Sequence, residues 1–385
     1  MLTEHTKTLV KATVPALEAH GTDITRVFYR NMFAAHPELL DIFNKTNQKQ
    51  GKQQTALASA VLAAAKHIDN LGDILPHVVQ ISHKHRALQI KPEHYPIVGE
   101  HLLGAIKEVL GDAATPEIIA AWAEAYGAIA DVFIGVEKEM YQEAAWPGFA
   151  DFTVTGKRQV GGGIAEFTVK PADISLPEIR AGQYITVQVR PEAQGNLALR
   201  HYSICSTDIS DGLKFAVKRD NGNGHHGLVS NYLHDHVNVG DTIRLSAPAG
   251  DFLWQNGSNP IVLISAGVGI TPIMAMLEAQ VNANPARKLV WVHAARNAGA
   301  HAFKQETEAL LDKADDAERH ILYREEGGCI NAAWLEAHTP ADADVYLCGS
   351  IGFMESIAGE LDSLARKEQN VYFEPFGPKM SVVSV

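Results

Sequence analysis

The spacing of apolar residues changes twice along the chain, and this change limits the possible fold more than any other feature. From about residue 4 to residue 145, apolar residues recur with the period of an α-helix. From Phe152 to about Ala249 they alternate with polar residues, as in antiparallel strands. From Pro260 onward, short apolar runs alternate with helical stretches, as in a parallel sheet with crossover helices. The sequence therefore predicts three domains in series.

Two segments rich in turn-forming residues mark the predicted domain boundaries, 146–148 and 255–259. We expect an all-α domain over 1–147, a small antiparallel β-barrel over 148–256 and an α/β parallel-sheet domain over 257–385. The helices expected in the first domain are 22–33, 53–69, 75–89, 97–110 and 115–141. The strands expected in the third domain are 261–265, 289–293, 320–323, 345–348 and 371–373.

Composition narrows the class of protein. A length of 385 residues with 46% hydrophobic content suits more than one core. The net charge of −12 argues against nucleic acid and anionic membranes as partners, and no apolar run approaches the roughly 20 residues that span a bilayer. The N-terminus lacks a signal-peptide pattern, and the three cysteines are widely spaced, which suits a reducing compartment. We therefore expect a cytoplasmic protein.

His85 lies in the middle of the apolar stripe of the helix expected over 75–89, whereas His83 points roughly the opposite way. The pattern therefore predicts that His85 is buried and His83 is not. One interpretation is a core histidine bonded to a carbonyl group. Two other residues favour a second interpretation. Tyr95 follows just after this helix, and Glu137 lies on the apolar stripe of a later helix, where a carboxylate needs a partner. Together the three side chains predict an imidazole that binds a metal as an axial ligand and is held in place by hydrogen bonds.

Two glycine-rich turns follow strands expected in the third domain: Ala266-Gly267-Val268-Gly269-Ile270-Thr271-Pro272 and Cys348-Gly349-Ser350-Ile351-Gly352-Phe353-Met354. Glycines let the backbone approach a pyrophosphate, and a helix start offers free N–H groups. Two such turns at the carboxyl ends of strands predict a nucleotide-binding cleft. The first turn lacks the third glycine of the ordinary Rossmann motif, which points to a related fold. We place Pro272 at the first helical position.

Three segments carry candidate flavin contacts. Arg200-His201-Tyr202-Ser203 can supply a phosphate contact, a stacking face and a hydroxyl, although a strand with a surface arginine is an alternative interpretation. Gly227 leads into a short helix with Ser230 near its start, which predicts a second anion site. In Glu374-Pro375-Phe376-Gly377-Pro378, an aromatic ring held by two prolines fits either docking within the fold or stacking on a flavin.

These residues resemble the flavohaemoglobin family over essentially the whole chain. The positions that carry the resemblance are Phe28-Tyr29, Phe43, Gln53 with Leu57, Lys84-His85, 89–93, 98–103, Arg200-x-Tyr202-Ser203, 266–272 and 374–378. The predicted order of domains is also that of the family: a globin, a flavin-binding barrel and a nicotinamide-binding domain.

The resemblance implies noncovalent haem b and FAD, with NADH or NADPH as the reductant. It makes His85 the proximal iron ligand, oriented and strengthened as a donor by Tyr95 and Glu137. It places Tyr29, Gln53 and Leu57 around bound O2 on the distal side. Phe28, Phe43 and Lys84 would belong to the haem pocket, with Phe43 packed on the porphyrin and Lys84 near the haem edge.

In the other two domains the resemblance assigns nucleotide contacts. The implied FAD-binding residues are Tyr184, Arg200, His201, Tyr202, Ser203, Gly227, Val229, Ser230, Glu374, Pro375, Phe376, Gly377 and Pro378. The implied NAD(P)-binding residues are Gly267, Val268, Gly269, Ile270, Thr271, Pro272, His293, Arg296, Cys348, Gly349, Gly352, Phe353 and Met354. Arg296 stands where it could meet the adenosine ribose, so NADPH is an alternative to NADH. The segment 221–227 departs from the family pattern, and its pair His225 and His226 could be interpreted as a metal site, but no third ligand is in view, which argues against one.

The resemblance further implies nitric oxide dioxygenation, in which electrons pass from NAD(P)H through FAD to iron, and O2 and nitric oxide yield nitrate. Two other functions stay open: a haem-dependent reductase of alkyl or lipid hydroperoxides, and a sensor of O2 or redox state with a maintenance reductase. As partners we expect O2 and nitric oxide, no nucleic acid and no transmembrane segment. We also expect a monomer, with a lipid in the distal pocket as a further option.

Overall fold

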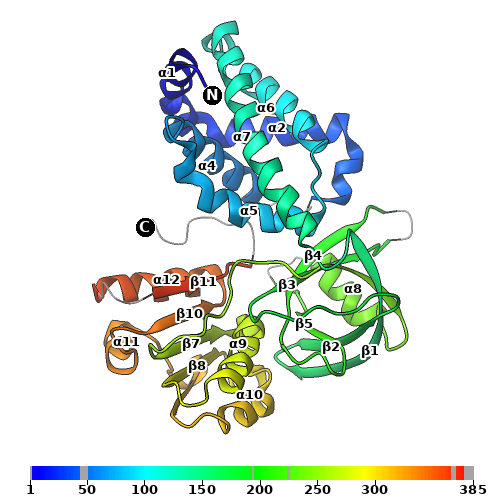
Figure 1. Cartoon of the computed structure of the whole chain (residues 1–385), viewed down its shortest axis with the longest axis vertical. Coiled ribbons are helices and arrows are strands. Elements are labelled where there is room, and N and C mark those ends of the chain that lie inside the picture. The colour runs from blue at the N-terminus through cyan, green and yellow to red at the C-terminus, as the bar shows by residue number, and fades with distance from the viewer. Residues whose placement is uncertain (1, 44–50, 193–194, 223–225, 366–369, 377–385) are drawn as a thin grey trace. The chain divides into compact units, whose positions relative to one another are not determined.

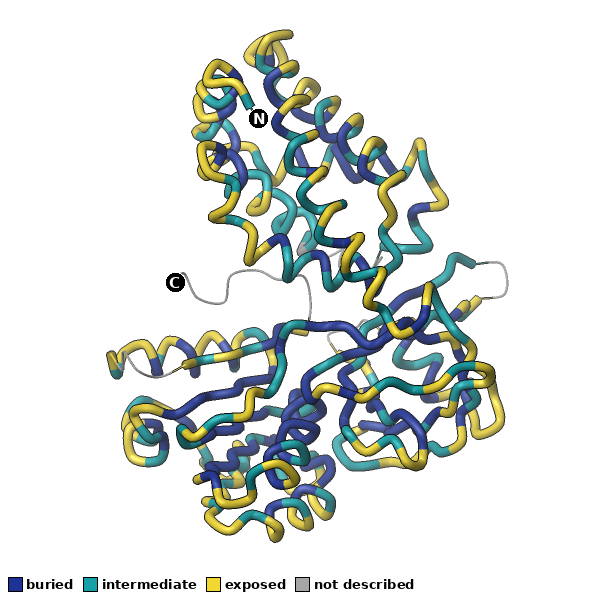
Figure 2. The backbone as a smooth tube through the Cα atoms, in the orientation of Figure 1, coloured by how far each residue is buried: buried dark blue, intermediate teal, exposed yellow. Residues whose placement is uncertain are grey.

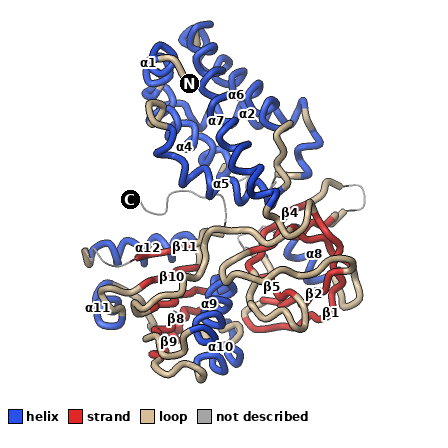
Figure 3. Tube along the Cα trace, viewed as in Figure 1, coloured by secondary structure: helices blue, strands red, loops and turns tan. Residues whose placement is uncertain are grey.

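The structure is a computed structural model that describes residues 2–43, 51–192, 195–222, 226–365 and 370–376. By its internal contacts the chain divides into two compact units. Among the described residues, the first unit contains the chain up to Gly148 together with the segment up to Leu199 that begins at Glu192, and the second contains Phe149–Pro191 and the chain from Arg200 to Phe376. The first unit is helical, and the second combines an antiparallel and a parallel sheet (Figures 1 and 3).

Six α-helices form the described part of the helical unit: α1 Glu4–Ala12, α2 Val14–Ala35, α4 Lys52–Lys66, α5 Leu75–Leu88, α6 His94–Leu110 and α7 Pro116–Gln142. Short 3₁₀ turns lie at Pro37–Asp41, Leu71–Ile74 and Gly111–Ala113. The expected helices are all present, but α2 begins at Val14 rather than at residue 22. The core between the helices includes the buried side chains of Phe28, Leu102 and Trp122.

The end of α5 is set by its capping residue. Gln89 adopts the left-handed conformation with a φ of 64°, and its N–H group donates to the carbonyl oxygen of Arg86. Left-handed residues are common just past the end of a helix, because they let the last carbonyl groups find donors. The helix therefore ends at Leu88, which places His85 in its last turn.

The antiparallel sheet has six strands: β1 Phe149–Gly161, β2 Ile164–Pro171, β3 Tyr184–Val189, β4 Ala198–Ser203, β5 Leu213–Lys218 and β6 Thr242–Ser246. Their spatial order is β4-β3-β6-β1-β2-β5. The two outer strands meet through an isolated bridge between Ile204 and Phe215, which closes the sheet into the predicted barrel. The helix α8, Leu228–His236, follows β5 along the chain.

The parallel sheet has five strands, β7 Ile261–Ala266, β8 Leu289–Ala295, β9 Ala317–Tyr323, β10 Asp344–Cys348 and β11 Asn370–Phe373. Their order is β11-β10-β7-β8-β9. The helices of this part are α9 Ile270–Ala283, α10 Lys304–Leu311, α11 Ala332–His338 and α12 Ile351–Ser363. Side chains of α9 and α10 join one core with the sheet, and those of α11 and α12 join another, so both faces are covered.

Burial of the strands follows their place in the sheet (Figure 2). Every residue of β10 is buried, as are all but the last of β7, because these strands have neighbours on both sides. The edge strand β9 has no buried residue. Continuous apolar runs are typical of central parallel strands, which explains why the sequence identifies β7 and β10 so clearly.

One helix among the described residues, α7, is long and apolar enough by length and composition to cross a membrane. Within the structure, 22% of the most apolar 18-residue stretch of this helix is buried. The helix contacts α1, α5 and α6 inside the helical unit, and a core helix of a water-soluble domain passes the same test. This helix alone therefore does not indicate a membrane protein.

Candidate functional site

Three side chains predicted to act together meet in the helical unit. Glu137 of α7 is 2% exposed, and its Oε1 lies 2.7 Å from Nδ1 of His85 and 2.6 Å from the hydroxyl oxygen of Tyr95. The hydroxyl of Tyr95, at the start of α6, also lies 3.2 Å from the same nitrogen of His85. A carboxylate only accepts hydrogen bonds, so the imidazole proton that faces Glu137 resides on Nδ1, and in the neutral ring this tautomer leaves the lone pair on Nε2.

The surroundings hold this cluster in place. The Phe133 ring packs on both His85 and Tyr95, with ring centroids 5.7 and 6.2 Å away. Tyr126 donates to the backbone carbonyl of Tyr95 at 2.7 Å, and a methyl group added at Gly99 would lie only 2.6 Å from the Tyr126 ring. Burial, together with the hydrogen bond to Glu137, raises the pKa of Tyr95. Tyr95 therefore keeps its proton and remains a donor to Glu137 at physiological pH.

The expected contrast between the two histidines of α5 is wrong. His83 and His85 are both half-buried, and the side chain of His85 is 31% exposed. The helical period separates the directions of the two side chains, but it does not report which neighbouring helices cover each direction. What distinguishes His85 is its bonding to Glu137 and Tyr95.

The residues predicted on the distal side also gather in one region. Tyr29 is 7% exposed, and its ring centroid lies 4.7 Å from Phe28 and 5.8 Å from Phe43. Leu57, on α4, packs in the same core as these rings, and Gln53 lies one turn earlier on that helix, half-buried. Lys84, beside His85 on α5, is half-buried as well.

The two glycine-rich turns lie against each other, because β7 and β10 are adjacent and Ser265 pairs with Cys348. A methyl group added at Gly269 would lie 2.2 Å from the carbonyl oxygen of Cys348. At Gly267, whose φ is +54°, an added methyl group would meet nothing within 4 Å. The backbone above Gly267 is therefore open, and close packing requires glycine at Gly269.

The positions that follow differ from the expectation in detail. Pro272 is the third residue of α9 rather than the first, which still lies within the first turn, where helix N–H groups have no helical partner. Ile270, Thr271 and Pro272 are buried. In the second turn, Gly352 is exposed, Phe353 half-buried and Met354 buried, with Ser350 accepting a hydrogen bond from the Phe353 N–H group.

His293 is fully buried near the end of β8, where its Nδ1 is hydrogen-bonded to Ser265 Oγ at 2.8 Å. The ring stacks on that of His301 at 4.6 Å, and Nε2 of each ring has no hydrogen-bond partner among the described residues. Burial, with the neighbouring His301, lowers the pKa of His293 to about 3. His293 is therefore a neutral support beneath the first turn.

The burial of His293 makes the free energy of unfolding depend on pH. The unfolded chain binds a proton at His293 below about pH 6.5, whereas the folded chain does so only near pH 3, so stability falls by up to about 1.4 kcal/mol per pH unit as the pH drops through this window. We expect His293→Gln to lose less stability than wild type between pH 6.5 and 5, measured by urea unfolding with FAD release as the signal. His226→Gln, at an exposed position, is the control. Equal slopes in all three proteins would contradict the prediction.

The predicted flavin residues of the barrel lie on β3, β4 and α8. His201 Nδ1 is hydrogen-bonded to Thr186 Oγ1 at 2.8 Å, and its ring lies 4.8 Å from that of Tyr184. Arg200 and Tyr202 are half-buried, while Ser203 is buried. Burial lowers the pKa of Arg200 and raises that of Tyr202. The outer strand β4 thus presents a cation beside an aromatic ring, as the sequence indicates.

Gly227 caps the start of α8, as expected. A methyl group added there would lie 2.6 Å from Ser230 Oγ, so the turn is closely packed. Val229 is buried and Ser230 half-buried. The proposed histidine pair before this helix is not supported in its described part. His225 lies outside the described residues, and His226 pairs with Asn221 and joins no described group of metal-ligating side chains.

The C-terminal motif lies at the end of β11, beside β10. Glu374 and Pro375 are buried, and the backbone oxygen of Glu374 lies 3.5 Å from Cys348 Sγ. Phe376 is 44% exposed, which suits a stacking surface better than docking within the fold. Gly377 and Pro378 lie outside the described residues.

Comparisons with known proteins agree with this arrangement. Residues 26–133 match the globin family, 151–254 match the oxidoreductase FAD-binding domain and 263–359 match the oxidoreductase NAD-binding domain. The Flavohemoprotein of Bacillus subtilis is 45% identical, and the match covers 99% of each chain. This chain belongs to the flavohaemoglobin family. It is an oxidoreductase that joins a globin to FAD- and NAD-binding domains, so the predicted fold class and the predicted classes of cofactor are confirmed.

Other relatives of this flavohaemoglobin extend the comparison. The Flavohemoprotein of Deinococcus radiodurans is 43% identical over 100% of this chain and 99% of its own. A flavohemoglobin from Malassezia yamatoensis, solved with bound FAD and heme, is 28% identical with a TM-score of 0.88 over 98% of this chain and 100% of its own. The FAD/NAD-binding domain of a nitric oxide dioxygenase from Vibrio cholerae is 35% identical, with a TM-score of 0.55 over 60% of this chain and 99% of its own.

Some residues of this flavohaemoglobin's sites gave no signal in the sequence. Ser265 and His301 hold His293, and Glu325 lies 3.6 Å from Arg296. Ser265 meets His293 because β7 and β8 are neighbours in the sheet, and Glu325 meets Arg296 because these residues follow the neighbouring strands β9 and β8. The apolar runs of parallel strands do not report the order of the strands, and the contact of His301 depends on the fold of the segment after β8. A serine in an otherwise apolar strand was the one available hint.

Proposed function

We propose that this flavohaemoglobin is a nitric oxide dioxygenase, which uses NAD(P)H and O2 to convert nitric oxide into nitrate. The observation that carries the proposal is the buried Glu137, which accepts from both His85 and Tyr95. A carboxylate on the far nitrogen of an imidazole increases its donor strength at the near nitrogen. An electron-rich axial ligand favours the reaction of bound O2 over its simple storage. The similarity to a nitric oxide dioxygenase domain in the reductase half adds support.

The residues fit the two cofactors that the family implies. Nε2 of His85 keeps a lone pair, which is the donor that a haem iron takes. Arg200, Tyr202 and the cap of α8 offer a cation, an aromatic face and N–H groups, which are the partners of a flavin nucleotide. When bound, the haem supplies the O2 site, and FAD splits the hydride of NAD(P)H into single electrons.

The chain's own groups then have distinct tasks. Glu137 and Tyr95 orient His85, and Tyr29 lies buried among aromatic rings, where its hydroxyl is suited to donate to O2. The glycine-rich turns leave open backbone above Gly267 for the pyrophosphate of the nicotinamide cofactor. The exposed ring of Phe376 is suited to cover the flavin ring. Cytoplasmic location, a monomer and a lipid ligand stay predictions.

The deciding experiment is stopped-flow mixing of the NADH-reduced, O2-equilibrated protein with nitric oxide, followed by measurement of nitrate. We expect rapid, stoichiometric nitrate and about two nitrate ions per NADH, since a hydride carries two electrons. Slow or substoichiometric nitrate, with faster consumption of an alkyl hydroperoxide, would instead support the peroxide reductase. Lack of turnover with both nitric oxide and the alkyl hydroperoxide would instead support a sensor of O2 or redox state.

The choice between NADH and NADPH gives a further prediction. Arg296 is exposed just after the end of β8 and lies near Glu325, whose carboxylate competes with a cofactor phosphate for the guanidinium group. We expect Arg296→Glu to lower kcat/KM for NADPH relative to NADH by roughly tenfold, because a cation is lost where a 2′-phosphate could bind. Glu325→Gln should raise the same ratio by about 2- to 5-fold, the range for an exposed ion pair. An unchanged ratio in steady-state assays of both variants would remove Arg296 from the cofactor site.

A further inference from the structure

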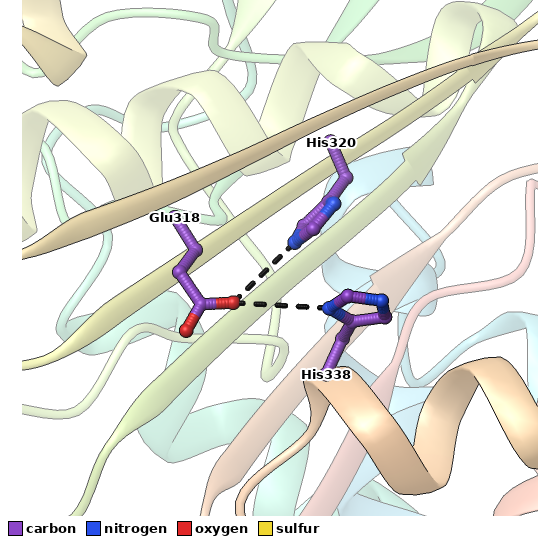
Figure 4. Close-up of side chains that lie close together, drawn as sticks. All are labelled: Glu318, His320 and His338. Carbon is purple, nitrogen blue, oxygen red and sulfur yellow. Dashed lines mark hydrogen bonds and ion pairs between the residues drawn. The ribbon is translucent and has the colours of Figure 1, made fainter.

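A second cluster of ligand-type side chains lies outside the two glycine-rich turns, on the edge strand β9 and at the end of α11. Glu318 and His320 are two residues apart on the edge strand β9, so their side chains share one face of the sheet. His338 is the last residue of α11, which lies on that face. Figure 4 shows both imidazole rings turned toward one oxygen of the Glu318 carboxylate.

The distances suit a metal ion. Glu318 Oε2 lies 3.4 Å from Nε2 of His320 and 3.9 Å from Nδ1 of His338, and the three ligand atoms lie within 4.8 Å of one another. Two ligands about 2.1 Å from a tetrahedral zinc ion are about 3.4 Å apart, so small side-chain movements would close the site. No second group of three such side chains lies this close together in the described part of the chain.

The two rings are held from behind by an aromatic side chain. The Trp334 ring lies 5.0 Å from that of His320 and 4.6 Å from that of His338. Trp334 lies in the first turn of α11, where its backbone N–H group donates to the side-chain oxygen of Asn331. Lys288 approaches the other oxygen of Glu318, Oε1, at 3.8 Å, so Oε2 faces the histidines. Packing of this kind orients ligands before a metal binds.

From this geometry we propose that Glu318, His320 and His338 bind one divalent transition-metal ion of the zinc class. Two neutral imidazoles and one carboxylate are ligands that zinc prefers over calcium or magnesium. Three protein ligands leave a fourth position for water, and their exposures of 44%, 21% and 34% leave a path from solvent. The ion would tie the last turn of α11 to the edge strand β9. This inference does not depend on the proposed dioxygenase activity.

The test is calorimetric titration of the chelator-treated, full-length holoprotein with zinc chloride. We expect one site with a Kd of about 10 µM or lower in wild type, and binding at least about tenfold weaker in His320→Gln and His338→Gln. The matched control is His67→Gln. His67 pairs with Asp73 at 3.5 Å on the surface, but no third ligand joins them among the described residues, so this variant should bind like wild type.

A second measurement keeps the proposal open to refutation if a variant folds poorly. Zinc K-edge absorption of the one-equivalent complex should report two imidazole nitrogens per zinc, and the iron of a haem does not interfere at this edge. The proposal is overturned if wild type, His320→Gln and His338→Gln bind zinc alike, if wild type binds only above about 100 µM, or if the spectrum lacks two imidazoles.

Discussion

His85→Ala should leave the protein with little or no haem while it keeps FAD and NADH-dependent reduction of a dye acceptor. In the proposed assignment the imidazole of His85, which Glu137 and Tyr95 hold in place, is the axial ligand of the haem iron, and removal of a bound ligand costs more than the 10- to 100-fold in affinity typical of its supporting partners. Nitrate formation should therefore fall by at least about 100-fold. The haem-to-FAD ratio by absorbance and the rate of ferricyanide reduction measure the two halves independently.

His83→Ala is the matched control, since it removes an equally half-buried imidazole two residues away on the same helix. We expect this variant to retain haem, because the hydrogen bonds with Glu137 and Tyr95 are made by His85. If His83→Ala lost the haem and His85→Ala did not, the assignment of the ligand would be wrong. Loss of dye reduction in His85→Ala would show that the variant is misfolded in both units.

The fold was largely predictable because its elements carry strong periodic patterns. The stripe of α7 predicts the bounds of this helix within a few residues, and the continuous apolar runs of β7 and β10 report burial directly. The start of α2 was not predictable from its pattern, because Pro15 and Gly21 interrupt the N-terminal part of this helix. Proline is tolerated in a first helical turn, which is where Pro15 stands.

The residues of the candidate site also divide into those that could be predicted from the sequence and those that could not. Glu137 could be paired with His85 from sequence, since a carboxylate on an apolar stripe requires a partner and few were available. The equal burial of His83 could not be predicted, because burial of one helical face depends on which helices pack around it. The cluster of Glu318, His320 and His338 could also not be predicted from the sequence. These residues meet only once α11 has folded back over the exposed edge strand β9.

Tyr29→Phe should release O2 faster by about 10- to 100-fold, the kinetic equivalent of roughly 1.4 to 2.7 kcal/mol for one lost hydrogen bond to a partly charged acceptor. The replacement keeps the ring that packs on Phe28 and Phe43, so fold and haem content should survive. Turnover at low O2 should fall with the off-rate. Stopped-flow measurement of O2 dissociation gives the first quantity, and nitrate formation at low O2 gives the second.

Flavin reduction by NADH is the internal control for this variant, because hydride transfer takes place in the nucleotide-binding part of the chain and should keep its wild-type rate. An O2 off-rate within about twofold of wild type, less than 0.5 kcal/mol, would contradict the assignment of Tyr29 as the donor. Gln53, half-buried on α4, would then be the residue to replace next. A Gln53→Leu variant with a faster off-rate would move the hydrogen bond to the amide, since leucine fills similar space but cannot donate.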